Sequence, residues 1–312
     1  MQIQPCGPLR GEITVPGDKS ISHRAVMLGA LANGTTHITG FLMGEDCLST
    51  IDCFRKMGVE INITDDEVIV EGVGLHGLEA PSEALYTGNS GTTTRLLCGI
   101  LAGQPFTVTM SGDPSIQKRP MGRVMKPLRE MGASIEGKND NFCPLTLFPS
   151  ELHGIEYRLP VASAQLKSAI LLAGLYAEGQ TTVIEPAPSR DHTERMFRAL
   201  GVEIETNGST ITLDPPEDLH AVDIAVPGDI SSAAFFLVAG AIVPGSELTI
   251  KNVGVNPTRT GVLDVLRDMG ADITESNFRD EAEPMCDLTV KYSKLHGVEI
   301  GGAIIPRLID EL

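Results

Sequence analysis

Polar and basic residues gather near the start of the chain, where a short corner leads into an apolar run. Residues 15–20 read VPGDKS, and Arg24 follows just before the apolar run at 25–32. The N-terminus of a helix presents unpaired backbone N–H groups and the positive end of the helix dipole, which together favour an anion. Lys19, Ser20 and Arg24 would add two charges and a hydroxyl group there, on side chains long enough to converge. A single stretch of this kind is more typical of a helix that starts with solvated charges. The interpretation as an anion site therefore depends on whether similar corners occur elsewhere in the chain.

Three further corners of this kind precede apolar runs. They read GNSGTTTR at 88–95, ASAQLK at 162–167 and GDISS at 228–232. The Gly- and Thr-rich second corner suits close approach of the backbone to an oxyanion. Two more turns, QKRP at 117–120 and PSRDH at 188–192, place basic side chains before amphipathic helices. Arginine pairs with phosphate or carboxylate through two parallel hydrogen bonds, so the recurrence favours an anionic ligand over separate solvated charges.

Other familiar motifs lack their context. GVGLHG at 72–77 fits GxGxxG but leads to Pro81 instead of an apolar helix, and neither GxxxxGK[ST] nor HExxH occurs. His23 and His192 have the chemistry for proton transfer, but with no partner evident we expect local hydrogen bonding for both. Asp18 and Asp229 are predicted to cap or orient their corners.

Four segments end an amphipathic helix in nearly the same way, which indicates an internal repeat. They read FRKMGV at 54–59, LREMGA at 128–133, FRALGV at 197–202 and LRDMGA at 266–271, with glycines 74, 69 and 69 residues apart. Each glycine is predicted to end its helix in the left-handed conformation, and the methionines at 57, 131 and 269 to fill the core. The order of predicted elements in each repeat is βαβαββ, which places the chain in the α/β (α+β) class.

The two helices of each repeat differ in character. The first is apolar nearly all round, at 25–32, 95–102, 166–177 and 233–243, and should be buried on most sides. The second is amphipathic and should lie on a surface. Buried helices inside a shell of sheets would bring their N-termini to one face, where they concentrate N–H groups and dipoles.

A fifth repeat begins near Val298 and reaches Leu312 inside its expected first helix. We therefore expect a chain truncated at its C-terminus, whose six-repeat parent would contain about 420 residues if the spacing persists.

Composition sets limits on the class of protein. The chain has 24 basic and 41 acidic residues, a formal net charge of −17, which argues against a nucleic-acid or anionic-membrane surface. Its six scattered cysteines, without CxxC spacing, are expected to be reduced thiols, and the N-terminus lacks a signal-peptide pattern. These features predict a cytoplasmic protein that binds neither nucleic acid nor membrane.

The corner motifs resemble those of the 5-enolpyruvylshikimate-3-phosphate (EPSP) synthase family along the whole chain, and most resemble its bacterial subclass with SAQ and SRDHTE signatures. The matching segments are PGDKSISHRA at 16–25, GNSGTTTRLLCG at 88–99, QKRPMGR at 117–123, SAQLKSAILLAGL at 163–175, SRDHTERM at 189–196, PGDISSAA at 227–234 and IPRLIDEL at 305–312. The resemblance implies an enolpyruvyl transferase of the shikimate pathway, with an inside-out barrel of repeats in two closing domains. It also implies a monomer at full length, and no metal or cofactor.

The resemblance assigns site residues as expectations. Lys19 is expected between the two substrates. Shikimate 3-phosphate would contact Lys19, Ser20, Arg24, Ser163, Gln165 and Arg190. Phosphoenolpyruvate would contact Lys19, Gly91, Thr92, Arg119 and Gln165. Asp310 is expected to accept the proton of the attacking 5-hydroxyl. Further residues of the family site would lie beyond Leu312, so this chain alone is expected to show little turnover.

The same resemblance places residues 17–226 in a three-repeat domain and residues 1–16 with 227–312 in a second, partial domain with exposed apolar faces. Two alternatives stay open. One is UDP-N-acetylglucosamine enolpyruvyl transferase, disfavoured because the loop 112–120 lacks that enzyme's cysteine. The other is a non-catalytic anion-binding repeat scaffold, disfavoured because basic and Gly-rich residues concentrate at the corners.

Overall fold

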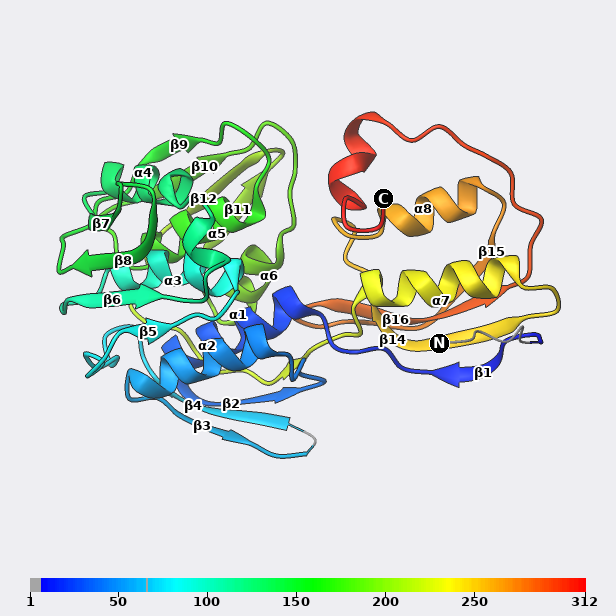
Figure 1. Cartoon of the computed structure of the whole chain (residues 1–312), viewed down its shortest axis with the longest axis horizontal. Coiled ribbons are helices and arrows are strands. Elements are labelled where there is room, and N and C mark those ends of the chain that lie inside the picture. Colours follow the sequence, from blue (N-terminus) through cyan, green and yellow to red (C-terminus); the bar gives the residue numbers. More distant parts are fainter. Residues whose placement is uncertain (1–6, 66) are drawn as a thin grey trace. The chain divides into compact units, whose positions relative to one another are not determined.

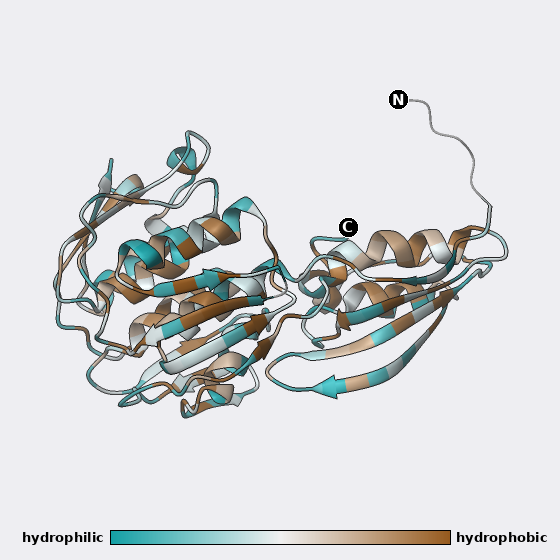
Figure 2. Ribbon diagram, turned by 90° about the horizontal axis from the view of Figure 1, so that it is seen from below, coloured by the Kyte–Doolittle hydropathy of each residue, from teal (hydrophilic) through white to brown (hydrophobic). Residues whose placement is uncertain are grey.

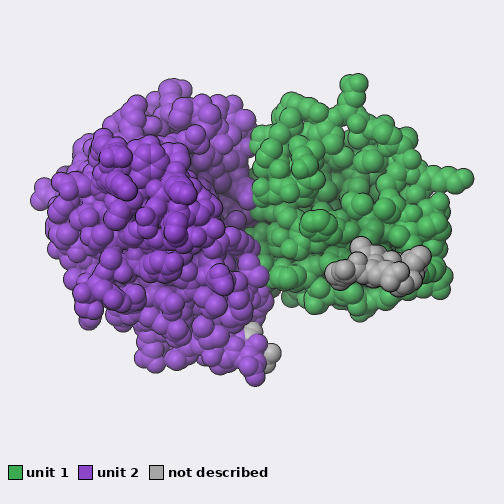
Figure 3. Space-filling model, in the orientation of Figure 1, with its two compact units in different colours: residues 1–18, 225–312 green, residues 19–224 purple. Residues whose placement is uncertain are grey.

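The computed structural model describes residues 7–65 and 67–312, so the expectation for Cys6 lies outside the described residues. The chain forms two compact units, one of residues 19–224 and one of residues 1–18 with 225–312 (Figure 3).

The larger unit contains three consecutive repeats (Figure 1). The elements of the first are α1 (Lys19–Leu31), β2 (Asn33–Thr39), α2 (Glu45–Lys56), β3 (Glu60–Ile63) and β4 (Glu67–Val73). Those of the second are β5 (Leu85–Tyr86), α3 (Gly91–Ala102), β6 (Val108–Ser111), η1 (Ile116–Lys118), α4 (Gly122–Glu130), β7 (Ser134–Lys138) and β8 (Phe142–Phe148). Those of the third are β9 (Glu156–Arg158), α5 (Ala164–Gly174), β10 (Thr181–Ile184), α6 (His192–Ala199), β11 (Ile204–Asn207) and β12 (Thr210–Leu213).

The smaller unit contains one repeat and a further segment. Its elements are β1 (Arg10–Ile13), α7 (Ile230–Ile242), β14 (Glu247–Gly254), α8 (Gly261–Asp268), β15 (Asp272–Asp280), β16 (Pro284–Lys291) and η2 (Gly302–Arg307), and β13 (Ile224–Ala225) lies at the boundary. The expected first helix of a fifth repeat is a short 3-10 helix, η2, which contains Pro306. Proline lacks the N–H that an α-helix needs, and Gly301 and Gly302 do not favour helix, so an α-helix is not favoured here.

Each repeat supplies most of one four-stranded sheet, in the orders β13-β2-β4-β3, β5-β6-β8-β7, β9-β10-β12-β11 and β1-β14-β16-β15. In three of the sheets a parallel pair lies beside antiparallel strands. In the second repeat, for example, β5 is parallel to β6, β6 is antiparallel to β8, and β8 forms the hairpin with β7. Strands in Figure 2 change between apolar and hydrophilic colours along their length, as one-sided burial requires.

The first strand of two repeats lies in another sheet, which the repeat pattern did not predict. β1 precedes α1 in the chain but pairs in parallel with β14 of the fourth repeat. β13 precedes α7 but joins the sheet of the first repeat beside β2. The mixed α/β repeat architecture is confirmed, and in the described part of the chain no sheet closes into a barrel.

Three of the four apolar helices are buried as expected. α1, α3 and α5 have nearly all their residues buried. α3 and α5 approach so closely that a Cβ on Gly99 would lie 2.2 Å from the Ala169 carbonyl oxygen, so this position accepts only glycine without a shift of backbone. α7 differs, because Phe235 is 78% exposed and Ile242 55% exposed, which leaves an apolar face uncovered.

The repeated Arg-x-x-Gly ending has a clear structural basis. Gly58, Gly132, Gly201 and Gly270 all have positive φ, between 89° and 103°, as predicted for left-handed helix ends. In three repeats the arginine donates hydrogen bonds to a carbonyl of the next strand, namely Arg55 to Ile61, Arg129 to Ile135 and Arg198 to Ile204. Arg267 of the fourth repeat instead pairs with Glu275. The motif therefore fixes the angle between the amphipathic helix and its hairpin.

The methionines at the helix ends, the cysteines and the lengths of the helices were also predicted from the sequence. Met57 and Met131 are fully buried and Met269 packs against the core of the smaller unit, as predicted. Cys47, Cys53, Cys98, Cys143 and Cys286 are free thiols, in agreement with the prediction for these five. Within residues 7–65 and 67–312, each helix is too short or too polar to cross a lipid bilayer.

Candidate functional site

The corner of the second repeat joins that of the third through side-chain hydrogen bonds. Ser90 caps α3 by accepting from the Thr93 N–H, so the helix begins at Gly91 with its N–H groups open. Arg95 Nη1 donates to Gln165 Oε1 at 3.0 Å, and Gln165 Nε2 donates to Thr92 Oγ1 at 3.1 Å. The N-terminal turns of α3 and α5 are thereby held together.

Two guanidinium groups border Gly91. A Cβ at this position would lie 2.7 Å from Arg95 Nη1 and 3.3 Å from Arg119 Nη1. Arg119 Nη2 also donates to Asn89 Oδ1 at 2.7 Å. The structure therefore brings together Gly91, Thr92, Arg119 and Gln165, the residues of the expected phosphoenolpyruvate pocket that surround this corner.

The electrostatics of this corner favour an anion. Burial lowers the pKa of Arg95, and the positive charges of Arg119 and then Arg123 lower it further. Such a shift means that the protonated guanidinium is disfavoured by its surroundings, which a bound phosphate or carboxylate would relieve. Open helix N–H groups add to the positive potential.

In the first-repeat corner Lys19 and Arg24 have different hydrogen-bond partners, and their convergence on one anion stays a prediction. Lys19 Nζ pairs with Asp46, in the first turn of α2, while its side chain stays about half exposed. Arg24 is buried, and donates to Thr193 Oγ1 and Ser168 Oγ at 2.7 Å each and to the Ser20 carbonyl at 3.0 Å. Five residues of separation on a helix place the two side chains on different faces.

The two histidines are both buried. His23 Nδ1 lies 2.7 Å from Thr50 Oγ1, which contacts Thr93 Oγ1 at 2.8 Å. Thr93 in turn donates to Ser90 at 2.7 Å. This chain of hydrogen bonds links α1 and the middle of α2 to the start of α3, and it confirms the prediction of local hydrogen bonding for His23.

The third-repeat corner presents Ser163, whose hydroxyl accepts from the Leu166 N–H and caps α5. Arg190 lies in the loop between β10 and α6, half-buried. Ser163 and Gln165 therefore flank the first turn of one helix, and Arg190 lies just before the start of another.

Asp310 belongs to the smaller unit and is exposed. Its segment is attached to α8 and to the loop before it, because Arg307 donates to the Pro257 carbonyl at 2.8 Å and pairs with Asp264 of α8 at 2.8 Å. The next residue, Glu311, accepts a hydrogen bond from the Ser231 hydroxyl.

An arginine that sequence reasoning missed organises this end of the smaller unit. Buried Arg259 donates to Ser231 Oγ at 2.8 Å and lies 3.3 Å from Asp229 and 3.5 Å from Asp18. Asp229 also caps α7 by accepting from the Ser232 N–H, as predicted. Burial, followed by the Asp18 charge, raises the pKa of Asp229 against the opposing effect of Arg259.

Other groups at the corners also escaped sequence reasoning. Asp46 pairs with Lys19, and Asn89 accepts a hydrogen bond from Arg119, so each contacts a residue that is expected to bind substrate. Arg95 links the corners of the second and third repeats. Asn89 and Arg95 belong to the corner motif at 88–95, whereas Asp46 lies outside all the corner motifs. An acidic or amide residue in a turn has no distinctive spacing, so no signal in the sequence pointed to Asp46.

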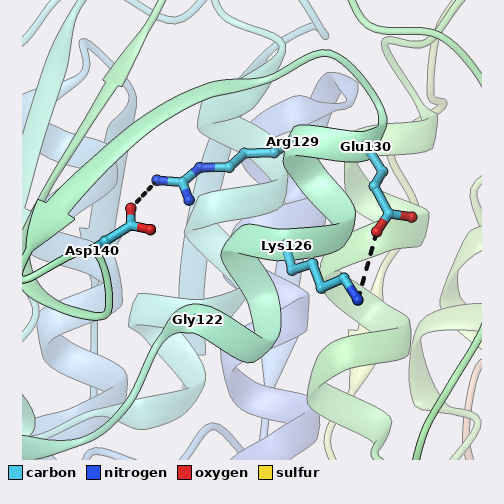
Figure 4. Close-up of a pocket in the computed structure, with 5 residues that line it drawn as sticks. All are labelled: Gly122, Lys126, Arg129, Glu130 and Asp140. Atoms are coloured by element: carbon cyan, nitrogen blue, oxygen red, sulfur yellow. Dashed lines mark hydrogen bonds and ion pairs between the residues drawn. The ribbon is translucent and has the colours of Figure 1, made fainter.

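A surface hollow on α4 is a less suitable anion site. Gly122, Lys126, Arg129, Glu130 and Asp140 line it, and its cations face acids, with Arg129 2.6 Å from Asp140 and Lys126 4.0 Å from Glu130 (Figure 4). Among the described residues, the His, Cys, Asp and Glu side chains form no group that could hold a metal ion.

These features define a class, namely repeat-built α/β proteins in which basic and polar side chains gather at the N-termini of buried helices. The profile of the EPSP synthase (3-phosphoshikimate 1-carboxyvinyltransferase) family matches residues 3–312. The 3-phosphoshikimate 1-carboxyvinyltransferase of Geobacillus thermodenitrificans is 63% identical over 306 residues, covering 97% of this chain and 71% of the relative. That of Bacillus anthracis is 59% identical, covering 99% of this chain and 73% of the relative.

Solved structures agree with the sequence comparisons. The structure of EPSP synthase from Acinetobacter baumannii superimposes with a TM-score of 0.93 at 52% identity, covering 98% of this chain and 70% of that chain. The chain therefore belongs to the EPSP synthase family, a family of transferases of the shikimate pathway. This confirms the predicted family, fold class and enzyme class, and it favours them over the UDP-N-acetylglucosamine and scaffold alternatives.

Proposed function

We propose that this chain binds shikimate 3-phosphate and phosphoenolpyruvate and supplies the groups that join them with release of inorganic phosphate. The observation that carries the proposal is the link between the starts of α3 and α5, where Arg95, Gln165 and Thr92 are hydrogen-bonded beside Arg119. The names of the relatives support the identity of the substrates.

Phosphoenolpyruvate is assigned to the Gly91 corner. Its phosphate and carboxylate match the Arg119 guanidinium, the Gln165 amide and the open N–H groups of Gly91 and Thr92. The absence of a side chain at Gly91 lets an oxyanion approach the backbone.

Shikimate 3-phosphate is assigned to the corners of the first and third repeats. Ser163, Gln165 and Arg190 would surround the 3-phosphate, and Ser20 and Arg24 the ring. The buried hydrogen bonds of Arg24 to Ser168 and Thr193 fix its guanidinium group, so its contribution is directed by the fold. Lys19 would lie between the two substrates and exchange its Asp46 partner for an anionic substrate group.

The chemical step requires one base and several cations. The 5-hydroxyl attacks C2 of phosphoenolpyruvate, the carbon that bears the phosphate ester, Asp310 accepts the hydroxyl proton, and the methylene carbon gains a proton. The tetrahedral intermediate then loses phosphate and a methyl proton, which restores the vinyl group. Lys19 and Arg119 would stabilise the charge that develops on the phosphate.

Further proposals concern the organisation of the protein. Residues 17–226 would form one domain, and residues 1–16 with 227–312 would be part of another. A cytoplasmic location and a monomeric state at full length are in keeping with free thiols and a net charge of −17.

Calorimetric titration with each substrate tests the proposal. Arg119→Ala should weaken phosphoenolpyruvate binding about tenfold or more, because a charge-assisted pair to phosphate is lost. Lys126→Ala, which removes an exposed cation that faces Glu130, is the matched control and should bind normally. Failure of the unmodified chain to bind either substrate would refute the proposal and favour a scaffold.

A further inference from the structure

A buried lysine and two buried glutamates lie next to the loop that carries Arg190. Lys167 Nζ is 2.9 Å from Glu185 Oε2 and 2.6 Å from Glu194 Oε1, and the three side chains are 1–3% exposed. Lys167 is in the first turn of α5, Glu185 follows β10, and Glu194 is in the first turn of α6. Because desolvation offsets much of the attraction in a buried ion pair, stability alone is a poor explanation for such a cluster.

The cluster holds Ser189, the residue directly before Arg190. Glu185 accepts hydrogen bonds from the Ser189 N–H at 3.4 Å and from the Ser189 hydroxyl. Lys167 Nζ donates to the Ser189 carbonyl at 3.5 Å. The N–H, the hydroxyl and the carbonyl of one loop residue are thus all held by the charged groups beneath it.

The cluster also adjoins the other groups assigned to shikimate 3-phosphate. Gln165 lies two residues before Lys167 on α5. Arg24 donates to Ser168 and Thr193, which directly follow Lys167 and precede Glu194 in the sequence. The backbone positions that carry Gln165, fix Arg24 and precede Arg190 therefore all meet at this one buried cluster.

We propose that Lys167, Glu185 and Glu194 are positioning residues that set the place of Arg190 relative to α5, and thereby the affinity for the phosphate of shikimate 3-phosphate. They touch no substrate, and they act through Ser189. This inference rests on the assignment of shikimate 3-phosphate in the proposed function.

Ser189→Ala tests the link without removing a charge. Calorimetry with shikimate 3-phosphate and with unphosphorylated shikimate gives the preference for the phosphate, which should fall about tenfold through the weakened Arg190 contact. Ser150→Ala, which removes a hydroxyl bonded to the Phe148 carbonyl and the Ser134 N–H, should leave it unchanged. An unchanged preference in Ser189→Ala, or an equal loss for both ligands, would overturn the proposal.

A second variant tests the charged groups themselves. Lys167→Met with Glu185→Gln and Glu194→Gln keeps the approximate shapes and leaves no buried charge unpaired, so the unit should still fold. It should lose the phosphate preference to the same extent as Ser189→Ala, and retention of that preference would count against the cluster.

Hydrogen exchange separates this inference from the proposed function, because it needs no ligand. Exchange at residues 185–191 should quicken in Ser189→Ala and stay unchanged in Ser150→Ala. If the unmodified chain fails to bind shikimate 3-phosphate, the substrate assignment is wrong, and faster exchange would still support the positioning of the loop. Unaltered exchange would refute the positioning role whatever the ligand does.

Discussion

The residue type at single positions decides whether this chain can bind an anion. Gly91 is the clearest case, because it has no side chain. Its backbone N–H is at the start of α3, and a methyl group at this position would lie 2.7 Å from Arg95 Nη1 and 3.3 Å from Arg119 Nη1. The space that an oxyanion would use is thus kept open by the absence of a side chain.

Gly91→Ala should therefore weaken phosphoenolpyruvate binding about tenfold while leaving the fold intact, because the displaced atoms are the ends of flexible arginines. Titration calorimetry and a thermal melt would check both parts. Normal affinity in this variant would place the ligand elsewhere.

Asp310 tests the chemical assignment separately from binding. Asp310→Ala should lower kcat by about two orders of magnitude or more with little change in substrate affinity, because a general base acts only in the transition state. Phosphate release under saturating substrates, measured for this chain with and without the substitution, would check the prediction. Equal loss in kcat and in affinity would instead make Asp310 a binding residue.

At this scale the sequence predicted residue types better than residue partners. Gly91, Thr92, Arg119 and Gln165 come together as expected, whereas Lys19 and Arg24 face different neighbours. Partners depend on which helices pack side by side, and a linear motif does not carry that information. Arg95 and Asp46 were missed for the same reason.

The elements show where a repeat can be read from sequence and where it cannot. The four Arg-x-x-Gly endings have the predicted glycine conformation, because a left-handed helix end leaves a mark at a single position. No residue pattern within a repeat indicates that β1 pairs with β14 or that β13 joins the sheet of β2. The partner of such a short strand depends on the path of the rest of the chain. Chain order is therefore a reliable guide to elements and a poor guide to sheets.

Close packing of α3 on α5 positions the two corners and can be tested by substitution. Gly99→Ala should destabilise the larger unit by about 1–3 kcal/mol, because the added methyl group meets the Ala169 carbonyl. Chemical denaturation followed by circular dichroism would measure the change. Gly297→Ala, where no atom lies within 4 Å, should be neutral; equal stability of the two variants would contradict the packing argument.

The sheet of the smaller unit depends on Asp287 at two register shifts. Its carboxylate accepts from the Asn252 N–H, Asn277 Nδ2 and Lys251 Nζ, each at 2.8 Å, where both neighbouring strands change register. Burial alone would raise the pKa of Asp287, but these hydrogen bonds outweigh it and hold the pKa below its ordinary value of 3.8.

A lowered pKa in the folded state means that the ionised form stabilises the fold. The contribution of Asp287, about 2 kcal/mol for hydrogen bonds to a charged group, should be present above pH 3.8 and lost as pH falls through the folded pKa. Asp287→Asn should remove that part of the acid destabilisation in thermal melts recorded against pH. If the melting temperature of Asp287→Asn fell at low pH as much as that of the unmodified chain, this role would be contradicted.

At the scale of the whole molecule, the assigned groups are divided between two compact units. Lys19, Arg119, Gln165 and Arg190 belong to the larger unit, whereas Asp310 belongs to the smaller one. The chain carries a net charge of −17, so an anionic substrate must be held by these local cations against an unfavourable overall charge. Binding should thus depend on the corners and not on the general surface.

The most direct test is a crystal structure of this chain grown with shikimate 3-phosphate and phosphoenolpyruvate. We expect electron density for anionic groups at the N-terminal turns of α3 and α5, within hydrogen-bond distance of Arg119 and Gln165. Density for these ligands at another surface, with both helix starts holding only solvent, would contradict this expectation.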